Sequence, residues 1–232
     1  MVSNMIEIVE REYEIEGTVK LRVVNPNGDV KVKGYKGSTL KLKAEKVWDL
    51  LSAEPKVRVK REGELFIIEA SSSKTFGKSY ANLHLLVPEI VVEEIKSVNG
   101  DVLLKNVRVK TVKTVNGDIT AENSRIGTVE SVSGDITIER SCISTAKTIS
   151  GDVSINFAEI CEDVFLATKS GDIEVAVPRS ANATIMVKTK SGDISSEIKG
   201  DFKKGMFLAT LGSGKHKLKI ATISGDVRIR LI

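Results

Sequence analysis

KTVNGDITAE (residues 113–122) places Asn-Gly-Asp between two segments in which apolar and polar residues alternate. Eight copies of Asn-Gly-Asp or Ser-Gly-Asp, each followed by Val or Ile, recur along the 232-residue chain. The copies at Gly100, Gly117, Gly134 and Gly151 are equally spaced, by seventeen positions, and the spacing then widens before Gly171, Gly192 and Gly225. A fixed period of this length indicates stacked structural repeats.

Positions at fixed distances from each Gly-Asp pair have a constant character. The residue four positions before the Asn or Ser is apolar, as in Val112 and Val129, and the residue two positions before it is small and polar, as in Thr114 and Ser131. Because successive side chains of a strand point to opposite faces, this alternation predicts a strand, a corner and a second strand, with one face of each strand buried.

The Gly-Asp pair is suited to the corner. Glycine accepts a positive φ without steric cost, and an Asp carboxylate can accept hydrogen bonds from backbone N–H groups that the corner leaves unpaired. Replacing Gly134 with Val is therefore expected to cost about 1–3 kcal/mol through backbone strain. We expect a structural ladder of corner residues, made of Gly28, Asp29, Gly100, Asp101, Gly117, Asp118, Gly134, Asp135, Gly151, Asp152, Gly171, Asp172, Gly192, Asp193, Gly225 and Asp226.

Two architectures fit these columns. Each Gly-Asp turn could close a hairpin of an antiparallel meander or sandwich, or each repeat could be one coil of a parallel β-helix. Apolar residues far from the corner, at Val109, Ile126, Ile143 and Ile160, recur with the same period as the glycines. A meander does not need such constancy, so the pattern favours a β-solenoid with coils of about 17–21 residues.

Composition supports an all-β chain. Apolar residues make up 41% of the sequence and aromatic residues 4%, so the core must be built mainly from Val, Ile and Leu, and β-branched residues suit strands. Residues 1–95 contain one early repeat and less regular alternation, and we expect them to form a β cap on a solenoid of residues 96–232, together one continuous structural unit. The segment SSSKTFGKSYAN, residues 71–82, is expected to be a mobile loop of the cap.

Charge and targeting signals indicate few partners. The net charge of +4 arises from 35 basic and 31 acidic residues that are interspersed, without a basic and aromatic cluster, so no nucleic-acid partner is expected. The N-terminal segment MVSNMIEIVEREYEIEG has acidic residues where a signal peptide has a basic start, and no apolar run of about 18 residues follows. We expect a cytoplasmic chain without a membrane span, and leave surface association open.

Several of these segments together resemble a known family. They are the early NGDVKV, the LLVPEI before the regular repeats, the series SVNGDV, TVNGDI, SVSGDI and TISGDV, the later VAVPRS, and the closing GSGKHKLKIATISGDVRI. Over roughly residues 18–232 the chain resembles the DUF4097 family of adhesin-like bacterial and archaeal proteins, related to the head domains of autotransporter adhesins. The resemblance implies a right-handed β-helix-like fold, no established catalytic residues, and an adhesive or surface-structural role. We therefore expect a non-enzymatic structural or interaction module whose partner is an unknown protein or surface.

Two alternatives to this function remain open. Stacked Asp carboxylates about 4.8 Å apart repel by about 0.9 kcal/mol even in water, and a row of Ca²⁺ ions could offset this. The chain would then be a calcium-stabilised solenoid. The structural interpretation, which predicts no metal, assigns the compensating charge to Lys96, Lys113, Lys147 and Lys188. The second alternative is a polysaccharide-acting enzyme on a β-helix, which rests on fold analogy alone.

No catalytic residue or cofactor is expected from the remaining motifs. His84 and His216 have no Ser or Cys partner at a motif spacing and are expected to be strand residues. GSGK, residues 212–215, lacks the first Gly and the final Ser or Thr of a phosphate-binding loop and is expected to be a tight turn.

The cysteines and the C-terminus give two further expectations. Cys142 and Cys161 are diagonal neighbours on a coil of the regular length, about 7–8 Å apart and beyond comfortable disulfide reach. The chain ends on Leu231 and Ile232, so we expect the last coil to be an uncovered sheet end through which the protein forms a homo-oligomer or docks on a partner.

Overall fold

The computed structural model describes residues 4–72 and 77–232. The described residues form 23 strands and no helix, so the chain is all-β. Two compact units divide the chain, one ending at Gly117 and the other running from Asp118 to Ile232, and they are called unit 1 and unit 2 below. The expected boundary near residue 95 lies inside unit 1 and stays a prediction.

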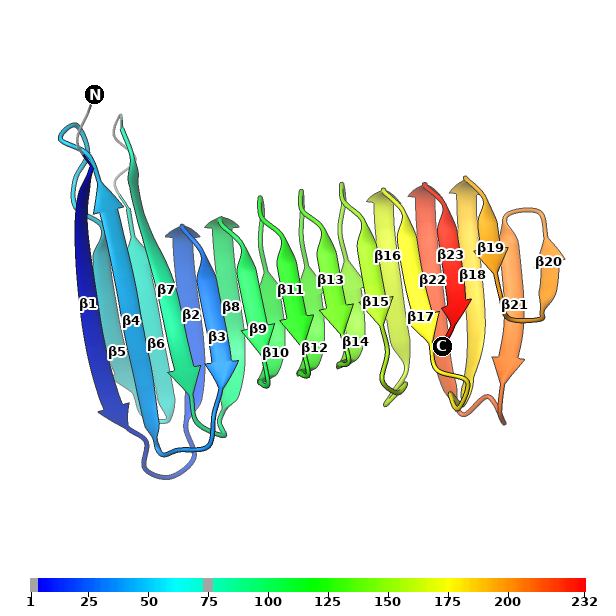
Figure 1. Cartoon of the computed structure of the whole chain (residues 1–232), viewed down its shortest axis with the longest axis horizontal. Coiled ribbons are helices and arrows are strands. Elements are labelled where there is room, and N and C mark those ends of the chain that lie inside the picture. The colour runs from blue at the N-terminus through cyan, green and yellow to red at the C-terminus, as the bar shows by residue number, and fades with distance from the viewer. Residues whose placement is uncertain (1–3, 73–76) are drawn as a thin grey trace. The chain divides into compact units, whose positions relative to one another are not determined.

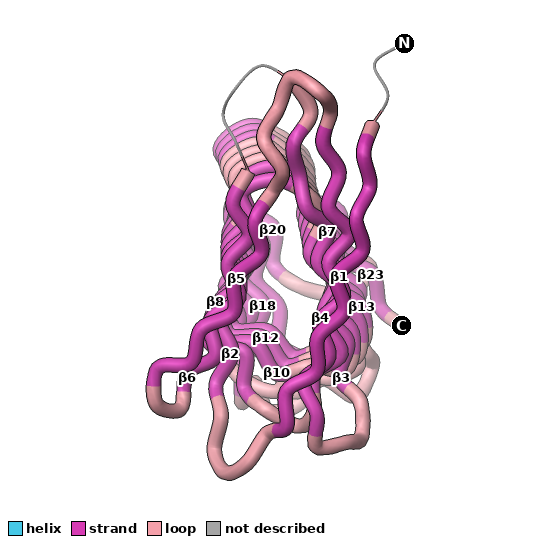
Figure 2. The backbone as a smooth tube through the Cα atoms, turned by 90° about the vertical axis from the view of Figure 1, so that its left-hand side faces the viewer, coloured by secondary structure: helices cyan, strands magenta, loops and turns pink. Residues whose placement is uncertain are grey.

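Unit 1 consists of two facing layers (Figure 2). The post-corner sheet, which holds the strands after each corner, has the order β1-β4-β7-β3-β9, and the pre-corner sheet has the order β5-β6-β2-β8-β10. The bounds are β1 Met5–Glu14, β2 Lys20–Asn27, β3 Val30–Gly34, β4 Thr39–Trp48, β5 Lys56–Glu62, β6 Leu65–Ser71, β7 Ser79–Val87, β8 Val91–Asn99, β9 Val102–Lys105 and β10 Arg108–Lys113.

Unit 2 has the same two-sheet plan. Its post-corner sheet has the order β11-β13-β15-β17-β23-β19, and its pre-corner sheet has the order β12-β14-β16-β22-β18-β21-β20. The bounds are β11 Ile119–Glu122, β12 Arg125–Glu130, β13 Ile136–Glu139, β14 Cys142–Lys147, β15 Val153–Asn156, β16 Val164–Ser170, β17 Ile173–Val177, β18 Ala183–Ser191, β19 Ile194–Ser196, β20 Asp201–Lys203, β21 Met206–Leu211, β22 His216–Ser224 and β23 Val227–Leu231.

Parallel pairing of equivalent residues decides between the two predicted architectures. β11 pairs in parallel with β13, and Ile119 lies opposite Ile136, one repeat away. In the facing sheet, β12 pairs in parallel with β14, and Ile126 lies opposite Ile143. These residues are almost completely buried between the sheets. The β-helix-like solenoid is therefore confirmed, and the antiparallel meander is wrong.

Antiparallel strands occur only beside the coils in the described part of the chain. In unit 1, β4 pairs antiparallel with β7 and with β1, and β5 pairs antiparallel with β6. In unit 2, β21 pairs antiparallel with β18 and with β20. Because parallel coils cannot satisfy the backbone groups of an outermost strand, these antiparallel strands extend the hydrogen bonding there.

One coil of each unit lies out of sequence order. In unit 2, β22 is hydrogen-bonded between β16 and β18, and β23 between β17 and β19 (Figure 1). In unit 1, β2 and β3 similarly lie between coils that come later in the chain. The order of the coils in space is therefore not their order in the sequence.

The position of β23 corrects the prediction of an uncovered last coil. After β19 the chain forms β20 and then β21, which returns beside β18, so that β22 and β23 enter the stack between existing coils. The Leu231 N–H donates to Glu197 Oε2 at 2.9 Å, and the Ile232 N–H donates to the Val177 carbonyl at 2.9 Å. The self-association inferred at Leu231 and Ile232 thus loses its premise and stays a prediction without that support.

Two smaller points complete the fold. The predicted loop at residues 71–82 is wrong at its ends, because Ser71 belongs to β6 and residues 79–82 to β7, and residues 73–76 lie outside the described residues. Within the described residues, no helix could cross a membrane.

Candidate functional site

The corner glycines stack closely on one another. A Cβ atom built on Gly100 would overlap the carbonyl oxygen of Gly28, and one built on Gly171 would overlap the carbonyl oxygen of Gly151. The same overlap occurs at Gly192, which faces Gly225. Because a backbone carbonyl cannot move aside without disturbing its own coil, glycine is required wherever a neighbouring corner carbonyl lies against it.

The predicted reason for glycine holds at only some corners. Gly28, Gly100, Gly117, Gly171, Gly192 and Gly225 have positive φ, as expected. Gly134 and Gly151 do not, so the strain predicted for Gly134→Val from positive φ is wrong. At Gly151 the observed reason is the close approach of the Gly134 carbonyl, which leaves no space for any Cβ atom.

The Asp column forms a continuous set of hydrogen bonds within each unit. The Asp152 N–H donates to Asp135 Oδ1 at 2.8 Å, and the Asp172 N–H donates to Asp152 Oδ1 at 2.7 Å. The same bond joins Asp101 to Asp29 in unit 1 and joins Asp135 to Asp118, Asp226 to Asp172 and Asp193 to Asp226 in unit 2. Each of these carboxylates that accepts an N–H group satisfies the corner of the next coil, which supports a structural role.

The hydroxyl column before the corner has a matching role. Thr168 Oγ1 donates to the Gly151 carbonyl at 3.0 Å, and Thr148 Oγ1 donates to the Gly134 carbonyl at 3.2 Å. These hydroxyls are buried, so each needs a partner, and the corner carbonyl provides it. At these two corners the small polar residue therefore fixes one corner to the previous one, whereas Thr114 Oγ1 and Ser131 Oγ of the same column are buried without a hydrogen-bond partner among the described residues.

Two of the four lysines predicted to offset the Asp charges have other contacts. Lys96 Nζ lies 2.9 Å from Glu94 Oε1, and Lys147 Nζ lies 5.3 Å from the centre of the Phe165 ring. Among the described residues, the Asp column also contains no three carboxylates close enough to share one cation. The calcium-stabilised alternative stays a prediction without a cluster of ligands in its favour.

A further copy of the corner was missed in the sequence. The Asp29 N–H donates to Asn82 Oδ1 at 3.0 Å, and a Cβ atom on Gly28 would overlap the Ala81 carbonyl oxygen. Ala81 and Asn82 therefore occupy the Gly and Asp positions of the coil formed by β6 and β7. Alternation in YANLHLLV, residues 80–87, was the signal that could have revealed this copy.

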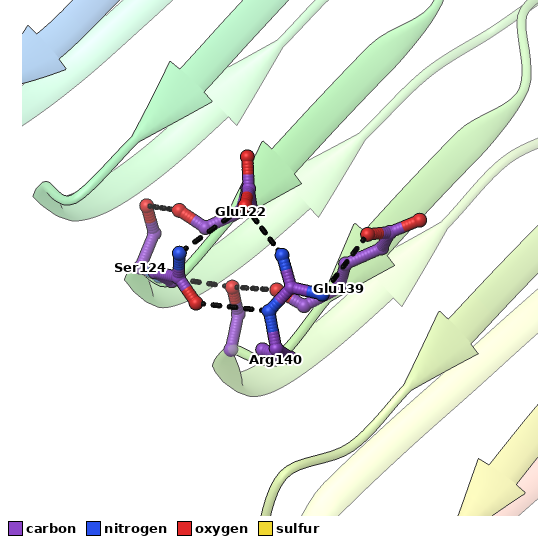
Figure 3. Close-up of polar contacts among 6 residues, drawn as sticks. Glu122, Ser124, Glu139 and Arg140 are labelled. Atoms are coloured by element: carbon purple, nitrogen blue, oxygen red, sulfur yellow. Dashed lines mark hydrogen bonds and ion pairs between the residues drawn. The ribbon is translucent and has the colours of Figure 1, made fainter.

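The opposite end of each regular coil in unit 2 has its own polar network (Figure 3). Asn123 and Arg140 have φ values of 49° and 47°, a left-handed conformation that is rare for an arginine. The Arg140 guanidinium contacts the Glu122 carboxylate, and its Nε donates to Asn123 Oδ1 at 3.2 Å. Ser141 Oγ accepts from the Ser124 N–H at 2.9 Å. The recurrence of Glu-Asn-Ser as Glu-Arg-Ser one repeat later was the sequence signal for this second corner.

The cysteine prediction is wrong. Cys142 and Cys161 form a disulfide in unit 2, with their Cα atoms 5.9 Å apart. The coil from Gly151 to Gly171 is longer than the regular coils before it, and its extra residues lie in the segment before β16. Across β14 and β16, Ala146 lies opposite Leu166, so Glu162 is the residue in register with Cys142. Cys161 is therefore one position away from the residue opposite Cys142, whereas coils of the regular length would place it two positions away. The irregular backbone around Cys161 then brings the two sulfurs together.

A groove of about 690 Å³ lies on the outer face of the post-corner sheet of unit 1. Its volume is within the range of ligand-binding pockets, about 300–1,000 Å³. Strands β1, β4, β7, β3 and β9 contribute its lining residues. Leu86 and Leu103 form an apolar part of the lining, and their side chains remain 39% and 41% exposed.

Cations predominate around this groove. The register places Lys43 and Lys31 on either side of His84, and Lys41 and Lys33 on either side of Leu86. Six basic residues other than His84 line the groove, against two acidic ones: Arg11, Lys31, Lys33, Lys41, Lys43 and Lys105, with Glu10 and Glu12.

Strand β1 neutralises one side of the groove only. Lys41 Nζ lies 3.0 Å from Glu12 Oε1, and Lys43 Nζ lies 3.1 Å from Glu10 Oε1. On the other side, Lys31 and Lys33 are exposed, and no carboxylate of the described residues lies within ion-pair distance of them. Burial, together with the neighbouring Lys31, lowers the pKa of His84, so its imidazole is neutral at pH 7. The groove is therefore a surface with surplus positive charge and an apolar lining.

The remaining candidate motifs have the predicted structures. His84 lies in β7 and His216 in β22, as expected for strand residues. Gly212 and Gly214 have positive φ between β21 and β22, which confirms that GSGK is a turn. The cross-strand neighbours of His84 are lysines, and His216 lies opposite Ala183, so neither position supplies a nucleophile.

Comparison with known proteins identifies the family. The Toastrack DUF4097 family profile matches residues 94–230, more than half of the chain. The chain belongs to the Toastrack DUF4097 family. The resemblance inferred from the Gly-Asp repeats is thus confirmed. No curated protein matches the chain.

Several solved structures are similar to this Toastrack chain. A "putative cell adhesion protein" from Clostridium sporogenes ATCC 15579 is 14% identical, with a TM-score of 0.41 over 97% of this chain and 100% of that one. A "putative adhesin" from Bacteroides fragilis NCTC 9343 is 13% identical, with a TM-score of 0.44 over 96% and 97%. A "putative lipid binding protein" from Parabacteroides distasonis ATCC 8503 is 14% identical, with a TM-score of 0.41 over 96% of each chain.

Proposed function

We propose that this Toastrack chain is a non-enzymatic interaction module, adhesin-like in type, that binds an acidic, extended protein segment in the groove of unit 1. The observation that carries the proposal is the surplus positive charge around that groove, where Lys31 and Lys33 face solvent beside the exposed Leu86 and Leu103. Like charges on neighbouring strands repel one another and lower stability, so an anionic partner would relieve a cost that the folded chain carries alone.

The form of the groove favours a chain-like partner. Its lining crosses five neighbouring strands, which at about 4.8 Å per strand corresponds to a length of about 20 Å. Such a length accommodates about six residues of extended peptide. Acidic side chains could reach the lysines, and apolar side chains between them could contact Leu86 and Leu103. A flat bilayer surface is less well matched to a concave lining.

The arrangement of ionisable groups favours binding over catalysis. Catalytic sites pair a nucleophile or an acid with a base at hydrogen-bonding distance. His84, the groove residue with a titratable ring, has Lys43 and Lys31 as its cross-strand neighbours. Lysines fixed around a neutral histidine can hold an anion, and they do not form the constellation that a hydrolytic triad needs.

The test is the binding of a fluorescent peptide with alternating Glu and Leu, measured by anisotropy at low and physiological salt. The chain should bind the peptide, and affinity should fall as salt rises because exposed charges are screened. Replacing Lys31 and Lys33 with Glu should abolish binding at physiological salt.

The matched control replaces Lys217 and Lys219 with Glu. These lysines are also exposed and two residues apart on one strand, β22 of unit 2, so the change in net charge is the same. Binding should persist in this control. Equal loss in both variants would mean that net charge, and not the groove, attracts the peptide. Absence of peptide binding together with binding to vesicles of anionic lipid would contradict the proposed partner.

A further inference from the structure

A cluster of two sulfurs and a carboxylate lies in unit 2, in residues that do not line the groove. Cys142 Sγ, Cys161 Sγ and a Glu159 carboxylate oxygen all lie within 4.8 Å of one another. Cys161 Sγ is 3.4 Å from Glu159 Oε1. Among the described residues this is the only group of three or more Cys, His, Asp or Glu side chains with such spacing.

The local chain holds these three donors in place. Cys142 begins β14, and its N–H donates to the Ser124 carbonyl at 3.0 Å. Glu159 and Cys161 flank Ile160, which is buried together with Phe157 and anchors the segment between β15 and β16. The two cysteines are half-buried and Glu159 is exposed, so solvent and a small ion can reach the cluster.

We propose that the reduced protein binds one Zn²⁺-like divalent cation through Cys142, Cys161 and Glu159, and that the disulfide is the metal-free, oxidised state of the same site. The unit would then alternate between a covalent and a metal-mediated connection of β14 to the segment before β16.

The donor spacing fits such an ion. Zinc binds thiolate sulfur at about 2.3 Å and carboxylate oxygen at about 2.0–2.2 Å, so tetrahedral ligand atoms lie about 3.3–3.8 Å apart. The separation of 3.4 Å between Cys161 Sγ and Glu159 Oε1 is in this range. The two sulfurs, bonded in the oxidised state, need to separate by less than about 2 Å, and the Cα separation of 5.9 Å leaves room for that change. Water could complete the fourth position.

The donor chemistry selects among ions. Thiolates are soft ligands and favour Zn²⁺ or Cu⁺ over Ca²⁺ and Mg²⁺, which prefer oxygen. A single carboxylate beside two thiolates gives a site charge of −3, which a divalent cation offsets in part. Glu162, which adjoins Cys161 in the sequence, is not part of the cluster.

The redox step balances with a dithiol as reductant. The dithiol transfers two electrons and two protons to the disulfide, which gives two Cys thiols and a disulfide in the reductant. Binding of M²⁺ then releases the two thiol protons, because only thiolates coordinate the metal. Oxidation reverses the sequence and expels the ion.

The experiment titrates Co²⁺ into the full chain before and after reduction with a phosphine, which does not itself compete as a thiol. The reduced chain should bind one Co²⁺ and develop an absorption band from thiolate-to-cobalt charge transfer, and the oxidised chain should not. Zn²⁺ should displace the Co²⁺ and raise the melting temperature of the reduced chain, because it binds only the native state. Absence of the band in the reduced chain would overturn the proposal.

Two carboxylate variants make the test specific, and both leave the disulfide intact. Glu159→Gln should weaken Co²⁺ binding by the reduced chain about tenfold or more, since even outer-shell partners of a metal site are worth about 10–100-fold. Glu162→Gln, a neighbouring change of equal charge, should bind as the wild type does. Equal affinities for the two variants would overturn the role of Glu159 and with it the three-ligand site.

Discussion

Units 1 and 2 are built on the same kind of Gly-Asp corner, but the side chains that their coils present to solvent differ. In unit 2, the outward position after each corner holds Thr120, Thr137, Ser154, Glu174 and Arg228 on successive neighbouring strands. In unit 1, the same kind of position holds His84, Lys31 and Leu103. The inward columns are apolar in both units. The comparison teaches that the repeat specifies the stack, while function depends on outward positions that the repeat leaves free.

The two units also differ in whether every corner has a glycine at the Gly position of the Gly-Asp pair. Ala81 replaces glycine in unit 1, where its strand is followed by the antiparallel β4 and no further corner. Gly151 and Gly171 of unit 2 each face the carbonyl of a preceding corner. Glycine is thus required by the neighbouring coil as well as by the backbone conformation of its own.

The largest expected effect is on stability, and it distinguishes the two reasons why a corner needs glycine, positive φ and a facing carbonyl. Gly171 has a positive φ and a facing carbonyl, Gly151 has only the facing carbonyl, and Gly63 in unit 1 has only a positive φ with open space around it. Strain and overpacking each cost about 1–3 kcal/mol, so Gly171→Ala should lose about 2–6 kcal/mol of unfolding free energy. Gly151→Ala should lose about 1–3 kcal/mol. Gly63 has a φ of 59°, in the left-handed helical region, so Gly63→Ala should lose about 1–2 kcal/mol.

Denaturant unfolding of the three variants provides the measurement. The order of midpoints should be Gly171→Ala lowest, then Gly151→Ala, then Gly63→Ala. A Gly151→Ala variant as stable as the wild type would show that the stacked carbonyl is not the reason for glycine there.

The next effect concerns the disulfide, which is present in unit 2 only. Closing a loop of this length stabilises a protein by about 3 kcal/mol, so the double variant Cys142→Ser, Cys161→Ser should melt at a lower temperature than the oxidised wild type. In metal-free buffer, a reductant should lower the melting temperature of the wild type and leave that of the double variant unchanged. A wild type that is insensitive to the reductant would mean that the disulfide does not form in solution.

The stacking of the coils could be predicted from the sequence, but their order in space could not. The Gly-Asp columns and the buried column at Ile126 and Ile143 were enough to predict parallel stacking, because each residue's environment is set by its copy in the next coil. The position of β22 and β23 was not predictable, because β16 and β18 are equally suitable partners for the same apolar column. Local pattern contains no information that chooses between identical neighbours.

The sites were less predictable than the fold. The lysines of the groove come from β3, β4 and β9. Strands β3 and β4 follow one another in the chain but are separated in the sheet by β7, and β9 comes much later, so only the register brings these lysines together. The disulfide was wrongly excluded because the coil from Gly151 to Gly171 is longer than the regular coils before it, which changed the register at Cys161. Sequence spacing predicts a contact only as long as the coil length is constant.

A smaller effect is expected in acid and concerns unit 1. Hydrogen bonds from Ser52 and from the Lys78 N–H hold the pKa of Asp49 below its ordinary 3.8, and a hydrogen bond from Lys46 holds that of Glu54 below 4.5. At Glu94, burial would raise the pKa, but Lys96 and Arg22 outweigh it and the pKa is lowered.

The direction in which stability changes with pH follows from the difference between the folded and unfolded pKa values. A carboxyl with a lowered folded pKa contributes stability that is complete above its ordinary value and is lost as pH falls through the lowered value. Thermal midpoints should therefore be constant above about pH 5 and decline below about pH 4.5. Asp49→Asn should be less stable at neutral pH and decline less steeply in acid. A parallel decline of variant and wild type would remove Asp49 from this account.

Lysine footprinting tests most directly the claim that an acidic partner binds in the groove on the outer face of unit 1. The intact chain is acetylated with and without the alternating Glu and Leu peptide, and mass spectrometry gives the reactivity of each lysine. Lys31 and Lys33 should lose most of their reactivity when the peptide is present, while Lys217 and Lys219 of unit 2 should react as before. Equal protection of the two pairs, or none at Lys31 and Lys33 under conditions where the peptide is bound, would contradict the account.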